Sequence, residues 1–197
     1  MKLYDLDLSG NCYKVRLFAS LISLPLDIVP VDFMQGEHKQ EALLRLNPWG
    51  EIPILEDDSI VLRDAQAILV YLANKHGGEA WWPSEAHLQA EVMQWLSVAS
   101  NEIQHGPNTA RLIKKFGYES DLALSVQRSN RVLALINDHL ADHDWLAVNR
   151  PTIADCAVYP YISVAYEGGI DIAEYSHINN WIARIKQLSG YIAMPGN

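Results

Sequence analysis

Ser9, Gly10, Asn11 and Cys12 stand between a short apolar segment and the first stretch of helical periodicity. The N–H groups at a helix start lack partners and carry partial positive charge, so they favour an anion. A serine hydroxyl there can donate a hydrogen bond to that anion, and the helix dipole favours a thiolate over a thiol. The spacing is that of a Cys-x-x-Cys redox motif with serine in the first place, which excludes a dithiol cycle. A simple helix cap is the alternative interpretation, since Ser, Gly and Asn all suit it.

Ile52-Pro53 and Asp64 mark two further places where the backbone could bind a ligand. A cis bond before Pro53 would leave the amide and carbonyl of Ile52 free for an extended peptide ligand, whereas the commoner trans bond would simply begin a strand. Asp64 precedes a strong helical segment, so a carboxylate ligand could sit on the N–H groups of that helix start. A capping role is again the alternative for Asp64.

His139 and His143 stand four residues apart on a predicted helix, with three aspartates beside them. This spacing could hold a metal ion. The sequence offers no third ligand, so we expect no metal site. It also contains no Gly-x-Ser-x-Gly elbow, no phosphate-binding loop and no Gly-x-Gly-x-x-Gly fingerprint.

The elements that must position these residues form two groups. In residues 1–77, apolar periods of two and of 3.6 residues alternate. They predict four strands and three helices, at residues 3–6, 12–22, 28–31, 40–46, 52–55, 60–62 and 64–75. The last two strands have the short connection of a hairpin, so we expect a mixed four-stranded α/β sheet with helices on both faces.

Residues 88–197 show helical patterns only, after a linker at residues 78–87 that contains Trp81-Trp82-Pro83. The predicted helices cover residues 88–105, 122–140, 153–165 and 178–185. We expect Gly106-Pro107 to break or kink the first of them. Residues 152–155, Thr-Ile-Ala-Asp, match a capping box. In this motif the threonine oxygen accepts the backbone N–H three residues later, and the carboxylate reaches back to the start of the helix.

The overall composition excludes several classes of function. The chain carries 15 basic and 24 acidic residues, a net charge of −9, so we expect no binding to nucleic acid or to an anionic membrane surface. No apolar run approaches the roughly 18 residues of a membrane span, and the first residues lack the pattern of a signal peptide. Two cysteines far apart form no disulfide framework, which favours a reducing cytoplasm.

Taken together, three motifs resemble those of cytosolic glutathione transferases. Residues 47–55 (Asn-Pro-Trp-Gly-Glu-Ile-Pro-Ile-Leu) resemble the family signature Asn-Pro-x-Gly-x-[Val/Ile]-Pro-x-Leu, and residues 64–72 resemble the [Glu/Asp]-Ser-x-x-Ile-x-x-Tyr-Leu segment that follows it. Residues 152–155 match the capping box of the family's helical domain. The resemblance covers essentially the whole chain, and Ser9 matches the activating serine of the bacterial, theta- and zeta-like branches.

This resemblance implies a thioredoxin-like N-terminal domain followed by an all-α bundle. It implies a cytoplasmic homodimer that conjugates reduced glutathione to small hydrophobic electrophiles, as in detoxification, with glutathione as co-substrate and no metal. We expect the following contacts: the sulfur at Ser9 and Asn11, the cysteinyl backbone at Ile52 and Pro53, the γ-glutamyl end at Asp64 and Ala65, and the glycyl carboxylate at His38. The family usually has serine where this chain has Ala65, and the lost hydroxyl contributes roughly 1.5–3 kcal/mol to binding.

Five residues are candidates for the substrate side of the site: Tyr4, Cys12, Asn101, His105 and Arg111. Other branches use a tyrosine in the first strand, and Cys12 could form a mixed disulfide with glutathione. Asn101 and His105 come just before Gly106-Pro107, where the family's long helix faces the ligand cleft, and Arg111 could face the cleft as well. A solvent-exposed helix surface is the alternative for these three residues. Two alternative functions stay open: a non-catalytic scaffold of the same fold, and a glutathione-dependent reductase of peroxides or disulfides.

Overall fold

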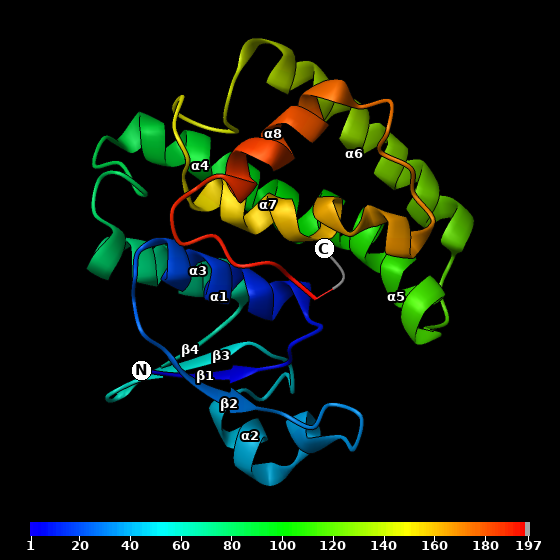
Figure 1. Ribbon diagram of the computed structural model, residues 1–197. Coiled ribbons are helices and arrows are strands. Elements are labelled where there is room, and N and C mark those ends of the chain that lie inside the picture. The colour runs from blue at the N-terminus through cyan, green and yellow to red at the C-terminus, as the bar shows by residue number, and fades with distance from the viewer. Residues whose placement is uncertain (196–197) are drawn as a thin grey trace.

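Four short strands form one mixed sheet in the order β2-β1-β3-β4. The computed structural model describes residues 1–195 (Figure 1). β1 (Lys2–Asp5) runs parallel to β2 (Asp27–Pro30) and antiparallel to β3 (Ile54–Asp57), and β3 runs antiparallel to β4 (Ile60–Arg63). The predicted mixed sheet is therefore confirmed.

Helices cover both faces of this sheet. α1 (Gly10–Leu21) and α3 (Ala65–Leu72) lie on the face toward the second half of the chain, and α2 (Glu41–Leu46) lies on the opposite face (Figure 1). Side chains alternate between the faces of a strand. Leu3 therefore belongs to the large core under α1, whereas its neighbour Tyr4 packs against the small cluster at α2.

Every described element after the sheet is a helix, which confirms the predicted all-α second part. α7 is buried along its whole length and packs against α1, α3 and α4 (Figure 1). The helices are α4 (Ala86–Val98), α5 (Thr109–Phe116), α6 (Leu122–Asp142), α7 (Ile153–Ser163) and α8 (Ser176–Lys186), with π-helical turns at Ala73–Gly77 and Ala99–Asn108 and 3-10 turns at Glu37–Lys39 and Ala165–Gly168.

Two details differ from the prediction. Gly106-Pro107 does not break the helix, which continues from α4 through the π-helical segment Ala99–Asn108 into α5. The wider turn accommodates a proline that lacks the N–H of a regular helix. β3 begins at Ile54 rather than at Ile52, because Pro53 has no N–H to give to a strand ladder.

The predicted capping box is present at the start of α7. The Thr152 hydroxyl accepts the N–H of Ala154 at 3.2 Å, and Asp155 Oδ2 accepts the N–H of Thr152 at 2.9 Å. The other oxygen of Asp155 accepts the N–H of Leu146 at 3.2 Å and the indole N–H of Trp181 at 2.9 Å. One buried carboxylate thus joins α7 to α8 and to the loop before it.

Candidate functional site

The register of the sheet brings three predicted ligand-binding segments together at one end of the strands. Tyr4 lies opposite Ile54, and Ile54 lies opposite Arg63. At this end, the chain leaves β1 toward Ser9 and leaves β4 toward Asp64. It also enters β3 here, directly after the Ile52-Pro53 bond. Three segments far apart in the sequence therefore surround one end of the sheet.

Ser9 caps α1 with its side chain. Its backbone is extended, at φ −79° and ψ 121°, and its Oγ accepts the N–H of Cys12 at 3.3 Å. Its O–H also donates toward the neighbouring Cys12 Sγ, and this hydrogen bond lowers the pKa of the Cys12 thiol against the larger opposing effect of burial. A hydroxyl can accept and donate at once. The cap and the anion donor, which the sequence left as alternatives, are therefore compatible in one side chain.

Tyr161 of α7 supports the first turn of α1 from the helical part. Its hydroxyl accepts the backbone N–H of Asn11 at 3.1 Å. Its ring lies so close to Gly10 that a Cβ at that position would come within 2.4 Å of a ring carbon. Only glycine allows this approach. The backbone N–H of Asn11 is thus bound inside the protein, which leaves its half-buried side-chain amide as the donor for a ligand.

Cys12 is a core residue and not part of an exposed substrate site. The side chain is fully buried, and its Sγ accepts the N–H of Leu6 at 3.4 Å. Burial raises the pKa of the Cys12 thiol to about 12. A thiol that stays protonated is a poor nucleophile, so this geometry argues against a mixed disulfide at Cys12.

Tyr4 also points away from Ser9. Its hydroxyl donates to Glu56 Oε2 at 2.6 Å, and its ring packs with the cluster on the α2 face. The bond to Glu56, with burial, raises the pKa of Tyr4 to about 12. These contacts argue against the expected role of Tyr4 in activating a ligand.

Arg111 of α5 is buried instead of facing an open cleft. Its guanidinium forms an ion pair with Glu167 and donates from Nη1 to the carbonyl of Leu8 at 3.0 Å. Glu167 also pairs with Lys115. Arg111 therefore ties the helical part to the residue before Ser9, which is a positioning role rather than the substrate contact expected from the sequence.

Asn101 and His105 line a hollow between the π-helical segment and α6. Its volume is 230 Å³, and its other lining residues are Glu102, Arg128, Arg131, Val132 and Leu135. None of these residues belongs to the sheet part of the chain. The structure thus places Asn101 and His105 beside α6, and it does not bring them to Ser9.

The bond between Ile52 and Pro53 is cis, as the resemblance predicts. At the neighbouring segment, Asp64 has φ 72° and accepts the N–H groups of Gln66 and Ala67, each at 3.0 Å. The N–H of Ala65 is the one in this first turn that Asp64 does not bind. A ligand carboxylate at the start of α3 would therefore meet the Ala65 amide.

His38 lies half-buried in the segment after β2. Its ring stacks on Phe33 with 3.8 Å between centroids, and its Nδ1 is buried without a hydrogen-bond partner among residues 1–195. Burial, with the charge of Lys39, lowers the pKa of His38. Because Nδ1 is buried here, the expected contact of His38 with a ligand carboxylate stays a prediction.

Lys14 is a residue of this region that the sequence analysis missed. Its side chain is fully buried, and its Nζ lies 5.3 Å from the ring centroid of Tyr161. Within residues 1–195, this nitrogen has no hydrogen-bond partner. Burial lowers the pKa of Lys14 to about 7, while the charge of Asp64 opposes that change. One feature of the sequence could have indicated that Lys14 is buried. It lies four residues from both Gly10 and Phe18, inside an otherwise apolar stripe of the helix.

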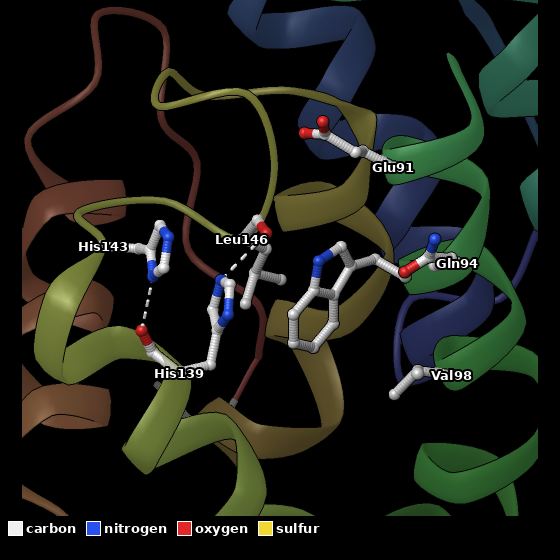
Figure 2. Close-up of a pocket in the computed structure, with 7 residues that line it drawn as sticks. Glu91, Gln94, Val98, His139, His143 and Leu146 are labelled. Carbon is white, nitrogen blue, oxygen red and sulfur yellow. Dashed lines mark hydrogen bonds between the residues drawn. The ribbon is translucent and has the colours of Figure 1, made fainter. Parts of the chain in front are cut away.

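His139 and His143 belong to a different pocket, of 420 Å³ between α4 and the end of α6 (Figure 2). Their rings stack in parallel with centroids 4.3 Å apart. His139 Nε2 donates to the carbonyl of Leu146, and His143 Nδ1 donates to the carbonyl of His139. Within residues 1–195, no group of three or more His, Cys, Asp or Glu side chains could hold a metal ion.

Comparison with known proteins identifies relatives along the whole chain. The family models described as "Glutathione S-transferase, N-terminal domain" and "Glutathione S-transferase, C-terminal domain" match residues 3–80 and 106–188. The chain is 33% identical to glutathione S-transferase 3 of Zea mays, over 84% of this chain and 79% of that protein. It is 28% identical to glutathione S-transferase 2 of Anopheles gambiae, over 90% and 86%.

A solved structure agrees with these sequence relatives. A possible glutathione S-transferase from Rhodopseudomonas palustris superposes with a TM-score of 0.92 at 32% identity, over 98% of this chain and 97% of that one. In the described part of the chain, no helix is long and apolar enough to cross a membrane.

Proposed function

Since this chain belongs to the glutathione S-transferase family, we propose that it conjugates glutathione to small hydrophobic electrophiles with Ser9 as the activating donor. The observation that carries the proposal is the Ser9 hydroxyl at the start of α1, which caps the helix through its lone pair and can donate its hydrogen to a thiolate. We also propose a division into a glutathione-binding domain (1–77), a linker (78–87) and a substrate-binding domain (88–197).

The energetics of thiolate formation suit this arrangement. Lowering the pKa of a free thiol from about 8.5 by 2 units requires roughly 2.7 kcal/mol. One hydrogen bond to a charged group contributes roughly 1.5–3 kcal/mol, and a helix N-terminus adds about 1 kcal/mol. Ser9 and α1 together therefore suffice, and the thiolate then attacks an electrophilic carbon and displaces its leaving group or adds to it.

The rest of glutathione would extend across the same end of the sheet. Ile52 offers its backbone beside the cis bond to Pro53, the start of α3 offers the amide of Ala65 and the carboxylate of Asp64, and His38 lies in the 3-10 turn after β2, where it would meet the glycyl carboxylate. Asn11 supplies a side-chain amide near the sulfur. Ala65 provides no hydroxyl, so we expect weaker binding of glutathione than in relatives with serine there.

Replacing Ser9 tests this role. Ser9→Ala should lower kcat/KM for a chloronitrobenzene electrophile by roughly 10- to 150-fold, because one hydrogen bond to the thiolate is lost. The thiolate absorbance of bound glutathione near neutral pH should disappear in a titration of the same variant. Ser9→Gly keeps most of the cap stability and should behave alike, whereas Ser59→Ala, in the exposed turn between β3 and β4, should leave both signals intact. An unchanged rate in Ser9→Ala would rule the proposed donor out.

We also propose that the protein is a cytoplasmic homodimer in which α3 and α4 of each subunit face the partner. The relatives support this assembly, and the two buried free thiols, Cys12 and Cys156, suit a reducing compartment. Sedimentation at micromolar concentration should give twice the 22.2 kDa mass of the chain. A species of the single-chain mass would contradict the dimer.

Ala65 is the observation that favours a non-catalytic scaffold as the second candidate. Turnover would be absent across electrophile panels in that case, and a stable protein partner would be found instead. The burial of Cys12 gives no support to a disulfide reductase.

A further inference from the structure

Lys14 carries its amino group into the contact of α1, α3 and α7. Its side chain is fully buried, and Nζ has no hydrogen-bond partner among residues 1–195. The Tyr161 ring is a close neighbour of the amine, with its centroid 5.3 Å from Nζ. An unpaired ammonium in such surroundings is costly, and burial accordingly lowers the pKa of Lys14 to about 7.

The amine lies beneath the proposed glutathione site. Helical side chains lean toward the helix N-terminus, so Lys14 reaches back toward the first turn of α1. The Tyr161 ring below its Nζ also closes on Gly10, and the hydroxyl of that ring binds the N–H of Asn11. On the other side, the charge of Asp64 at the start of α3 acts on the amine.

The ionisable groups around Lys14 leave its charge incompletely balanced. Asp64 from α3 is the anion that acts on it, and Tyr161 from α7 stays neutral because burial raises the pKa of its phenol. Cys12 of α1 is a buried, protonated thiol, and Arg111 of α5 is already paired with Glu167. A further anion at this end of the sheet would therefore favour the protonated amine.

We propose that Lys14 takes up a proton from solvent when glutathione binds, so that a neutral buried amine becomes an ammonium beneath the anionic ligand. This inference rests on the proposed function. Glutathione has two carboxylates and one ammonium, a net charge of −1, and its thiolate adds another negative charge. When one glutathione binds and ionises, the Lys14 amine gains one proton from solvent, and the glutathione thiol separately loses one proton to solvent.

Calorimetry in two buffers of different ionisation enthalpy measures this coupling. We use S-methylglutathione, which has no thiol proton, with the wild-type protein at pH 7.5 in phosphate and in Tris. A nearby anion that raises the pKa of Lys14 by about one unit gives an uptake of roughly half a proton per subunit. Lys14→Met and Lys14→Arg should bind without uptake, whereas Lys186→Met, an exposed lysine on α8, should match the wild type.

The pH profile of the uptake identifies the group without any variant. Uptake by Lys14 should be largest between pH 7 and 8, whereas uptake by His38 would be largest below pH 6.5, where its lowered pKa lies. Binding without uptake, a maximum below pH 6.5, or uptake that persists in Lys14→Met each overturns this inference and leaves the proposed function standing. No binding of glutathione or its S-methyl form up to several millimolar overturns the proposed function, and this inference with it.

Discussion

Lys14→Met should stabilise the protein by roughly 5 kcal/mol at pH 6 and by only about 2 kcal/mol at pH 9. The folded protein has a Lys14 pKa of about 7 because the side chain is buried, whereas an unfolded chain has the ordinary value near 10.5. Between these values the unfolded state binds more protons, so the wild-type free energy of unfolding rises with pH. Below pH 7 both states are protonated, and the wild type bears the full cost of a buried charge.

Urea denaturation of both proteins between pH 6 and 9 measures this difference. Methionine has nearly the length of the lysine stem and fills the same space. Lys186→Met is the matched control, and removal of this exposed charge should change the free energy of unfolding by less than about 0.5 kcal/mol at any pH. A wild-type-to-Lys14→Met difference that stays constant from pH 6 to 9 would show that the amine keeps an ordinary pKa.

Asp155→Ala should cost about 3–5 kcal/mol in the free energy of unfolding, because it leaves three buried N–H groups without an acceptor. These are the backbone N–H groups of Leu146 and Thr152 and the indole N–H of Trp181. The carboxylate is fully buried, so water cannot replace it. Asp155→Asn should cost less, because it keeps one oxygen and places an NH₂ group against one donor.

Asp121→Ala is the matched control for this loss. Asp121 caps α6 and accepts the N–H of Leu124 at 2.9 Å, but it lies at the surface. Its removal should cost about 1 kcal/mol in urea denaturation, the ordinary value of a helix cap. Equal losses for the two variants would mean that Asp155 acts as a cap alone, without joining α7 to α8.

Local patterns in the sequence determined the order and type of the elements. Alternating apolar residues favour strands, and apolar spacing of three to four residues favours helices, and both patterns can be read from local sequence. The capping box at Thr152 and Asp155 was predictable for the same reason, since its partners are three residues apart. The positions of Ser9 and Asp64 at helix starts likewise needed only their own turns of chain.

Contacts between distant segments decided which polar side chains meet the site. Periodicity shows that Lys14 and Arg111 lie on a helix, but only the packing of α7 on α1, and of Glu167 beside α5, buries them. Asn101 and His105 were expected at the cleft, and the structure places them in a hollow beside α6 instead. Burial and pKa depend on the opposing element, which no single stretch of sequence specifies. The tertiary structure alone therefore placed a buried amine against Tyr161, the ring that packs on Gly10 at the start of α1.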